Sequence, residues 1–388
     1  MKILIITISI LSFFVFNSPS SFRFDDGNRT IHSIDSSVTI SISVVGDLMC
    51  HSPQFQYAQI AKDSFDFSPV YRNVKKYLES SDFTFGNLET VTSGKSDGGY
   101  TGYPFFNTPS SYITALKDIG FDLLVTANNH SLDRKEKGIL KTIDEIENRN
   151  LNYVGTYKSQ RDRDSIRIFD VKGIKIAFLA YSYGTNGNPI PDGKNFLINL
   201  IDYELIENDI QSARENSAEL VLVHFHFGEE YKREPVQFQK DVVDKTIELG
   251  ADIIIGGHPH VLQPVNFFKT NNATLDSGFV AYSMGNFFSN QQDRYKDAGM
   301  ILTIDITKDL MNNNIEIKEV NYLPTWVFKG NTSNGKEYVI MPAIAISDST
   351  ITLSKKESAK MNQAFDDTRF IINKYTNNYR LKERRDKN

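Results

Sequence analysis

Short apolar runs separated by polar segments divide the first part of the chain into alternating strands and helices. Alternating or continuous apolar positions are typical of strands, whereas apolar positions three or four residues apart are typical of helices. The predicted strands are residues 38–45, 82–85 and 122–126, and the predicted helices are residues 110–119 and 138–148. Gly120 directly follows the first helix, at a position where glycine commonly ends one.

The same alternation continues through the middle of the chain and then changes. Strands are predicted at residues 166–171, 174–181, 219–225 and 252–255, and helices at residues 203–216 and 236–249. The later part reads as strands separated by turns, at residues 278–283, 300–306 and 314–320. This order predicts a layered α/β domain that is completed by mainly antiparallel strands.

The two ends of the chain differ from this central pattern. Residues 3–16 are uncharged and mostly apolar after Lys2, and residues 17–21 are mostly small and polar, which is typical of an export signal. The run is shorter than the roughly 20 residues that span a bilayer, so a cleaved signal is favoured over a retained anchor. The predicted organisation is an export signal or anchor at 1–21, a linker at 22–37, the main domain at 38–350, and a charged C-terminal helix and tail at 351–388. We expect that last helix, between residues 358 and 375, to be solvated.

The charge balance excludes some classes of partner. The chain has 43 basic and 48 acidic residues and a net charge of -5, without a stretch that combines dense Lys and Arg with aromatic residues. Nucleic acid is therefore not an expected partner. The single cysteine, Cys50, excludes an internal disulfide and is predicted to be a small buried residue.

Five polar clusters follow predicted strands and contain five of the seven histidines. They are Gly46-Asp47, Asn87-Leu88-Glu89, Asn128-Asn129-His130, His224-Phe225-His226 and His258-Pro259-His260. Open α/β folds bind ligands at the carboxyl ends of their strands, so these side chains are expected to gather along one edge.

The histidine pairs suggest a metal site. Neutral imidazole is a good ligand for zinc, manganese or iron, and Pro259 restricts the backbone between His258 and His260. His224 and His226 are two residues apart on a strand and point to the same face. Either both face one ion, or His226 alone is a ligand while His224 packs nearby; the second arrangement is favoured.

Oxygen ligands accompany these imidazoles. Asp47 and Glu89 offer carboxylates and Asn129 offers an amide oxygen, although such residues after a strand also serve as helix caps or turn formers. Their recurrence at strand ends favours the metal site. His130 either transfers a proton to a leaving group or forms a hydrogen bond that orients a ligand.

Together the motifs resemble the CapA family of poly-γ-glutamate capsule biosynthesis proteins over about residues 40–290. The matching segments are Gly46-Asp47, Gly86-Asn87-Leu88-Glu89, Asn128-Asn129-His130-Ser131-Leu132-Asp133, His226-Phe227-Gly228-Glu229-Glu230-Tyr231, Gly257-His258-Pro259-His260 and Ser283-Met284-Gly285-Asn286-Phe287. That family is similar to the calcineurin-like metallophosphoesterases. The resemblance implies a four-layered α/β/β/α sandwich with a centre of two divalent ions, manganese, zinc or iron.

The resemblance also implies roles for individual residues. Asp47 and His260 would hold one ion, Asn129, His226 and His258 the other, with Glu89 as a bridge and His130 as the catalytic imidazole. The candidate substrate-binding residues are Asn87, Asp133, Glu230, Tyr231 and Asn286. The last four match family positions that have no assigned chemistry, where they would shape the pocket, orient ligands or form hydrogen bonds within loops, and at least one of these four is expected to be structural.

Two positions depart from the phosphoesterase pattern. Met49 stands where that pattern has a histidine, and Asn87-x-Glu89 replaces its bridging aspartate motif. The first ion is then expected to be held weakly. His51 would compensate only if its loop curls back, and a surface or supporting role is favoured for it.

The predicted function is that of an exported, metal-binding protein that assists synthesis, export or attachment of an anionic γ-glutamyl polymer, with hydrolase or transfer chemistry. Its expected partners are the polymer and polymer-synthesis proteins of the cell envelope, with membrane attachment through the N-terminus if the signal is retained. A general envelope metallophosphoesterase and a non-catalytic polymer-binding scaffold are the alternatives.

Overall fold

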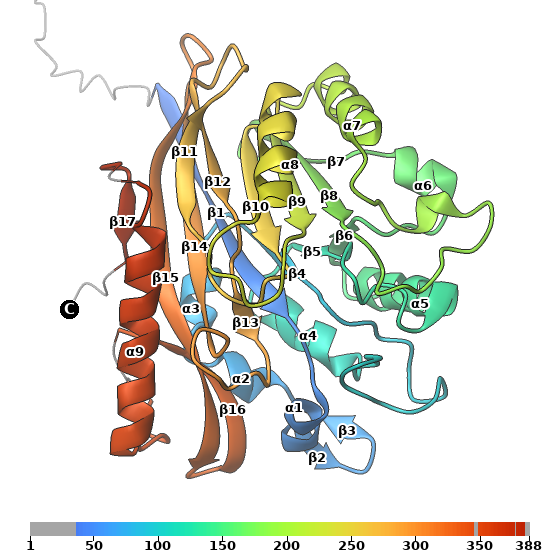
Figure 1. The fold of residues 1–388 in the computed structure, drawn as a ribbon, viewed down its shortest axis with the longest axis vertical. Coiled ribbons are helices and arrows are strands. Elements are labelled where there is room, and N and C mark those ends of the chain that lie inside the picture. Colours follow the sequence, from blue (N-terminus) through green and yellow to red (C-terminus); the bar gives the residue numbers. More distant parts are fainter. Residues whose placement is uncertain (1–35, 345–347, 377, 385–388) are drawn as a thin grey trace, which may run out of the picture. The chain divides into compact units, whose positions relative to one another are not determined.

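Two sheets form the centre of the protein (Figure 1). The computed structural model describes residues 36–344, 348–376 and 378–384, so the predicted export segment and nearly all of the linker lie outside the described residues. Sheet 1 has the strand order β16 (Gly335–Pro342), β15 (Ile315–Thr332), β14 (Ala298–Asp309), β1 (Ser37–Leu48), β4 (Phe83–Asn87), β5 (Leu123–Val125) and β6 (Asn152–Val154), with β13 (Asn286–Phe288) beside β1 and β17 (Leu381–Glu383) beside β15. Sheet 2 has the order β11 (Val265–Lys269), β12 (Ser277–Ala281), β10 (Ile253–Gly257), β9 (Leu220–His226), β8 (Ile174–Ser182) and β7 (Arg167–Val171).

Each sheet combines a parallel part with antiparallel strands. In sheet 1, β1, β4, β5 and β6 are parallel, whereas β1, β14, β15 and β16 form successive antiparallel pairs. In sheet 2, β8, β9, β10 and β12 are parallel, and the edge strands β7 and β11 are antiparallel. The predicted α/β domain with later antiparallel strands is therefore confirmed, and the parallel strands of each sheet end at one edge.

The main core lies between the two sheets. Alternate residues of β1, including Ile40, Ile42 and Val44, belong to the same buried cluster as Leu222 of β9 and Ile253 of β10. Successive side chains of a strand point to opposite faces, so the intervening residues of β1 face the other way. The interface between the sheets thus forms the middle of the sandwich.

Helices cover the outer faces of both sheets. The helices α2 (Ser68–Tyr71), α3 (Lys75–Leu78), α4 (Ser111–Asp118) and α5 (Lys135–Glu147) share one buried cluster with the outer face of sheet 1, and Cys50 lies in this cluster without exposed surface. The helices α7 (Tyr203–Glu215) and α8 (Gln237–Glu248) share another cluster with the outer face of sheet 2. Figure 1 shows α7 and α8 outside sheet 2. The predicted four-layered α/β/β/α sandwich is confirmed.

The helix α7 shows how local sequence sets these elements. Asp202 caps its first turn by accepting a hydrogen bond from the backbone N–H of Leu205 at 2.9 Å. Ile206, Ile210 and Ala213 are spaced by three or four residues and form its buried face. Among the described helices, none is both long enough and apolar enough to cross a bilayer.

The short elements of the chain lie mostly in its first half. They are α1 (Ser52–Tyr57), α6 (Gln160–Asp164), the 3₁₀ helix η1 (Asn195–Leu197) and the hairpin of β2 (Gln59–Ala61) and β3 (Ser64–Phe65). The helix α1 has a proline in its first turn, where the missing N–H costs no hydrogen bond.

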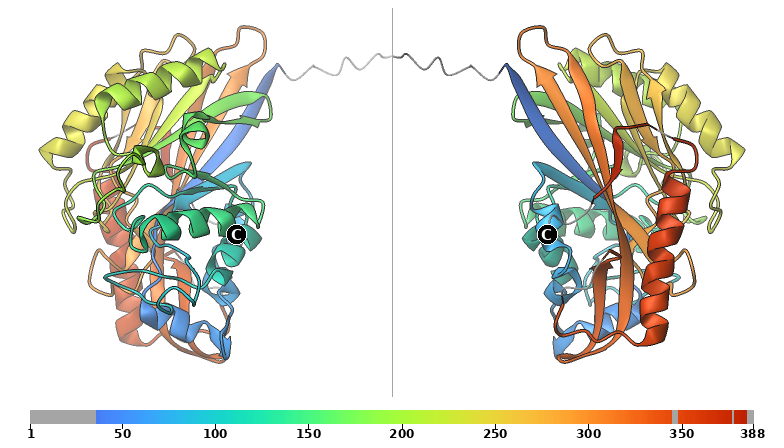
Figure 2. Two further views of the ribbon diagram at one scale, coloured as in Figure 1. Left: turned by 90° about the vertical axis from the view of Figure 1, so that its right-hand side faces the viewer. Right: turned by 90° about the vertical axis from the view of Figure 1, so that its left-hand side faces the viewer.

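The C-terminal helix packs against sheet 1, so the prediction of a solvated helix is wrong. Helix α9 (Lys355–Ile372) begins with a capping box formed by Ser354 and Glu357. Its buried residues recur every three or four positions and contact the clusters around β14 and β15; they are Met361, Ala364, Thr368, Ile371 and Ile372. The following strand β17 pairs with β15 (Figure 2). Because charged residues lie between the apolar ones, the sequence did not indicate that this helix has a buried face.

A polar network joins α2 to β16 and the segment around Asp348. Arg72 donates to Asp348 at 2.6 Å and to Glu337 at 2.9 Å, and Asn73 donates to Asp348 at 3.0 Å. Burial alone would raise the pKa of Asp348, but hydrogen bonds from Thr350, Asn73 and Arg72 outweigh it and lower that pKa to about 2.

Candidate metal centre

The predicted ligands meet where the carboxyl ends of the two sheets face each other. Asp47 of β1 is paired with Asn87 of β4, and His226 of β9 is paired with Gly257 of β10. The Oδ2 atom of Asp47 lies 3.0 Å from Nδ1 of His260 and 3.3 Å from the backbone N of His258. This carboxylate therefore connects sheet 1 to the histidine loop of sheet 2.

Glycines allow this close approach. A Cβ atom on Gly46 would lie 1.9 Å from the carbonyl oxygen of Gly285. A Cβ atom on Gly257 would lie 2.7 Å from Oδ1 of Asp47. Neither position has room for a side chain, so the glycines before Asp47 and His258 are needed to bring the ligands together.

Glu89 lies at the middle of the site and is fully buried. Its Oε1 atom is 3.5 Å from Nε2 of His226 and 3.7 Å from Nε2 of His260. This oxygen has no hydrogen-bond partner among the described residues. A buried carboxylate oxygen without a partner is costly, and a bound cation would satisfy it.

Two sets of possible ligand atoms share this carboxylate. One atom from each of Asp47, Glu89 and His260 lies within 4.8 Å of the others, and the same holds for Glu89, His226 and His258. Carboxylates and imidazoles suit manganese, zinc and iron. The donor set fits divalent ions at two neighbouring positions, with Glu89 between them.

The pKa shifts of the site residues agree with the binding of divalent ions. Burial, strengthened by His260, lowers the pKa of His258 to about 3, and burial together with the neighbouring histidines keeps the pKa of His226 well below its usual value. Burial and the charge of Asp47 raise the pKa of Glu89 well above its usual range. The imidazoles of His226 and His258 are thus neutral at pH 7, the form that binds metal, and a cation would favour the ionised Glu89.

The pKa of Asp47 changes in the opposite direction to that of Glu89. Burial alone would raise its pKa, but hydrogen bonds and charge from His260, with a hydrogen bond from Asn87, outweigh burial and lower it. Asp47 is therefore the carboxylate that is stably ionised in this site.

The histidine loop has an unusual backbone. His258 has φ 96° and His260 has φ 56°, a region that residues with a Cβ rarely adopt. Such conformations cost on the order of 1–3 kcal/mol each and persist where the surrounding structure imposes them. Here they hold two imidazoles, which are buried, beside Asp47 and Glu89.

Asn129 reaches the site from the loop after β5. Its Oδ1 atom lies 3.0 Å from Nε2 of His226, and its Nδ2 atom donates to Oδ1 of Asn186 at 3.2 Å. The hydroxyl of Tyr183 also forms a hydrogen bond with Asn129, and its ring centroid is 4.5 Å from that of His258. The amide oxygen of Asn129 is thereby oriented toward the ligands.

Sequence reasoning missed Tyr183 and Asn186. Their loop contains no histidine or acidic residue next to β8, so no ligand type drew attention to it. The available signal was its position, because it follows a parallel strand at the same edge as the histidines.

His130 is held by an acidic partner. Its Nδ1 atom lies 2.8 Å from Oδ2 of Asp133, an oxygen that also accepts the backbone N–H of Phe106 at 2.7 Å. The carboxylate accepts both bonds, so Nδ1 of His130 carries its proton and Nε2 is left for another partner. The ring of Phe106 packs edge to face against that imidazole, with centroids 4.7 Å apart.

Two other histidines lie near the centre without joining a ligand group. His224 is buried beside Gly257, consistent with the preferred prediction that it packs while His226 is the ligand. His51 is partly exposed, its Nδ1 atom lies 3.2 Å from Oε1 of Gln54, and its ring packs against Phe106. The favoured supporting role of His51 fits this arrangement.

The residues predicted to line the substrate site divide into two classes. Asn87 and Asn286 have no exposed surface. Asn87 donates to Asp47 at 2.8 Å, and Asn286 donates to Gln291 at 2.9 Å. Their burial, like that of Asp133, favours an orienting role over the predicted substrate contact.

Glu230 and Tyr231 instead lie at the exposed mouth of the site. Both are exposed, Tyr231 to 47 %. The backbone N–H of Tyr231 donates to the carbonyl of Pro259 at 2.7 Å, which ties their loop to the histidine loop. These two remain candidates for contact with a substrate.

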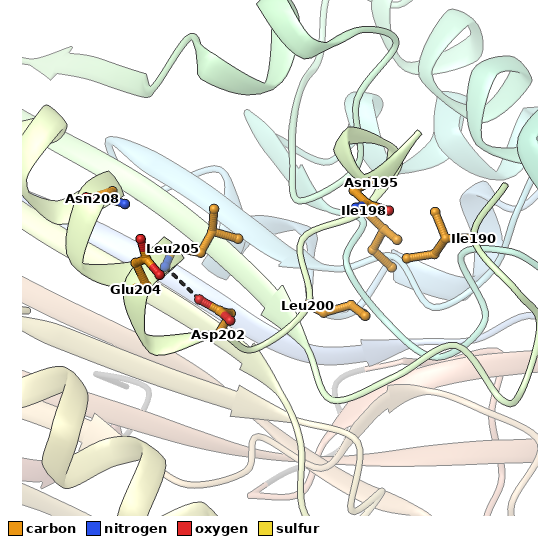
Figure 3. Close-up of a pocket in the computed structure, with 8 residues that line it drawn as sticks. All are labelled: Ile190, Asn195, Ile198, Leu200, Asp202, Glu204, Leu205 and Asn208. Carbon is orange, nitrogen blue, oxygen red and sulfur yellow. Dashed lines mark hydrogen bonds between the residues drawn. The ribbon is translucent and has the colours of Figure 1, made fainter. Parts of the chain in front are cut away.

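A separate cavity of about 450 Å³ lies beside α7 and does not contain the ligands (Figure 3). Its lining includes the apolar residues Ile190, Ile198, Leu200 and Leu205. It has two acidic lining residues, Asp202 and Glu204, and Asp202 is already used to cap α7. This cavity offers no set of polar groups comparable to the metal centre.

A known protein family matches more than half of the chain. The family is described as "Bacterial capsule synthesis protein PGA_cap", and the match covers residues 41–291. The chain belongs to this bacterial capsule synthesis family. The matched range contains every predicted ligand, from Asp47 to His260.

Two members of the capsule synthesis family illustrate the relationship. The chain is 30 % identical over 266 residues to "PGA biosynthesis protein CapA" of Bacillus subtilis (strain 168), covering 68 % of this chain and 67 % of that protein. It is 28 % identical over 269 residues to "Capsule biosynthesis protein CapA" of Bacillus anthracis, covering 68 % of this chain. The chain spans 63 % of the length of the Bacillus anthracis protein.

Similar solved structures are more distant. A putative 5'-nucleotidase from Staphylococcus aureus is 14 % identical, with a TM-score of 0.46, over 85 % of this chain and 58 % of that one. The calcineurin-like phosphoesterase YfkN from Bacillus subtilis is 13 % identical, with a TM-score of 0.40, over 86 % of this chain and 98 % of that one.

Proposed function

We propose that this protein acts outside the cytoplasm in bacterial capsule synthesis, as a metal-dependent hydrolase or transferase that works on an anionic γ-glutamyl polymer. The observation that carries the proposal is the convergence of Asp47, Glu89, His226, His258 and His260 in a member of the capsule synthesis family. Family membership supports the biological process, and the donor set supports the chemistry.

The residues that would hold the ions are those whose atoms meet around Glu89. Asp47 and His260 would bind at one position, and His226, His258 and the oriented oxygen of Asn129 at the other. When bound, divalent ions supply positive charge that lowers the pKa of water and stabilises developing negative charge.

The chain's own contribution to proton transfer would come from His130. Asp133 holds its Nδ1 proton, which orients the ring and stabilises the charged imidazole if Nε2 gains a proton. His130 would thus protonate a leaving group while Asp133 positions it. The packed ring of Phe106 limits the movement of this imidazole.

A genetic experiment tests the biological role. In a strain whose gene is deleted, wild-type protein should restore surface γ-glutamyl polymer, and the variant His258→Ala should fail to restore it at equal protein level. The variant Glu248→Gln, on the exposed side of α8, is the control and should behave as wild type. Full restoration by His258→Ala would contradict a metal-dependent role.

A general envelope metallophosphoesterase is the second candidate, and the His130–Asp133 pair beside the ligands favours it. It predicts hydrolysis of an aryl phosphate by the purified protein with manganese or zinc, abolished by His130→Ala. A metal-loaded protein that cleaves γ-glutamyl chains but no phosphate ester would exclude this candidate. Inertness toward both substrates would instead favour a scaffold that only binds the polymer.

The location and the partners are also part of the proposal. The apolar segment at residues 3–16 supports export, with polymer-synthesis proteins of the cell envelope as partners. Fractionation of cells that express the full chain tests this, because the protein should be recovered outside the cytoplasm. Removal of residues 1–21 should retain it inside and abolish polymer restoration.

A further inference from the structure

A third set of possible ligand atoms lies on the solvent side of the centre. One atom from each of Glu230, His258 and His260 lies within 4.8 Å of the others. Unlike the buried Glu89, Glu230 is exposed. Two imidazoles and one carboxylate are the donors that bind a catalytic divalent ion with a coordination position left open.

The local backbone places Glu230 over the histidine loop. The backbone N–H of Tyr231 donates to the carbonyl of Pro259 at 2.7 Å, and Tyr231 has φ 65°. The ring centroids of Tyr231 and His260 are 6.3 Å apart. The two loops are therefore tied together beside Glu230, and its position does not depend on a flexible side chain alone.

A second observation points to a missing partner at one of these three residues. The Nδ1 atom of His258 is buried and has no hydrogen-bond partner among the described residues, and His258 is 4 % exposed. An imidazole nitrogen that is shielded from water and has no protein partner is unfavourable. A cation, directly or through its bound water, would satisfy it.

We propose that Glu230 is a metal ligand, which together with His258 and His260 binds a divalent cation whose remaining coordination positions face solvent. This inference rests on the proposed function, because the same two imidazoles belong to the buried ligand sets. Each imidazole nitrogen has one lone pair and binds one cation, so Glu230 does not create a third ion. It adds an exposed carboxylate, on the solvent side, to an ion that these histidines hold in the centre with Glu89. The open positions of that ion are where an anionic group of the substrate would bind.

The neighbouring Glu229 provides a matched control. It is also exposed and lies one residue away on the same loop, but it belongs to no ligand group among the described residues. Replacement of Glu229 or Glu230 by glutamine removes the same charge from the same loop. Only the second replacement removes a ligand.

The experiment is a titration of metal-free protein with manganese and, separately, with zinc. Calorimetry gives the affinities and elemental analysis gives the number of ions retained. The variant Glu230→Gln should bind one of the ions about 10- to 100-fold more weakly than the wild type. The variant Glu229→Gln should match the wild type, and unfolding of both metal-free variants should match it too, because both side chains are exposed.

The outcomes separate this inference from the proposed function. If Glu230→Gln binds ions like the wild type while Glu89→Gln binds them weakly, this inference is wrong and the buried centre remains. If Glu229→Gln and Glu230→Gln weaken the binding of divalent ions equally, the effect is one of general charge, and the assignment of Glu230 as a ligand is also wrong. Wild-type protein that binds no divalent ion would refute both.

Discussion

Replacement of Glu89 by glutamine separates the cost of a buried charge from its benefit as a ligand. Glu89 is fully buried, and its Oε1 atom has no hydrogen-bond partner among the described residues. Leaving a buried polar group unsatisfied costs about 1–3 kcal/mol, and more when the group is charged. Glutamine keeps a polar oxygen at this position but carries no charge, and the raised pKa of Glu89 shows that burial of its ionised form costs stability. In metal-free protein near neutral pH, we therefore expect Glu89→Gln to increase the free energy of unfolding by about 1–3 kcal/mol.

With metal present the comparison changes. At an ion concentration of about 100 times Kd, wild-type protein gains about 2.7 kcal/mol from binding one ion. A tenfold loss of affinity in Glu89→Gln reduces that gain by about 1.4 kcal/mol. The variant should thus be the more stable protein with a chelator and should respond much less to manganese.

Urea unfolding is a suitable assay for this comparison. Trp326 is the only tryptophan and is 3 % exposed, so its fluorescence reports loss of the sandwich. The exposed Glu229→Gln is the control and should follow the wild type in both buffers. If Glu89→Gln is less stable than the wild type with the chelator and gains equally from manganese, the reasoning about this carboxylate is refuted.

Three further predictions concern other parts of the molecule. His130→Ala and Asp133→Asn should each lower the turnover rate about 10²- to 10⁴-fold and leave the affinity for manganese within about twofold of the wild type. A large loss of manganese affinity in His130→Ala would show that His130 is a metal ligand instead. Asp348→Asn should destabilise the protein above about pH 4. Because the folded pKa of Asp348 is lowered to about 2, the difference in free energy of unfolding between wild type and variant should shrink as the pH falls from about 4 toward 2. A difference that stays constant over this pH range would contradict the prediction. Gly46→Ala should lower the free energy of unfolding by at least about 3 kcal/mol or prevent folding, because its Cβ would lie 1.9 Å from a backbone oxygen. The control Gly184→Ala, whose Cβ would have no atom within 4 Å, should change the free energy of unfolding by less than about 0.5 kcal/mol in the same urea series.

Several elements followed directly from local patterns in the sequence. The helix predicted at residues 203–216 is observed at Tyr203–Glu215, and the strand predicted at 219–225 is observed at Leu220–His226. By contrast, β15 extends over Ile315–Thr332, well beyond the predicted 314–320. Pro324 lies inside it, and because a proline usually marks the end or the edge of a strand, the local pattern did not indicate that this strand continues.

The sequence also determined which chemistry the site offers. The carboxylates and imidazoles follow apolar strand segments, and parallel strands end at a common edge, so their meeting could be expected from the order of residues alone. The contact between Asp47 and His260 confirms that meeting across 213 positions of the chain. The membership in a capsule synthesis family likewise depends on residues 41–291 of the sequence.

Only the tertiary structure decided how each polar residue is used. Burial distinguishes Asn87 and Asn286, which orient other groups, from the exposed Glu230, and no local pattern encodes that difference. Tyr183 joins the site because β8 lies beside β9, a neighbour relation set by the sheet order. Periodicity in the sequence describes one helix or strand at a time, whereas burial and contacts depend on the elements that pack against it. For that reason the strands that contact α9 and the arrangement of side chains around Glu89 could be known only from the folded chain.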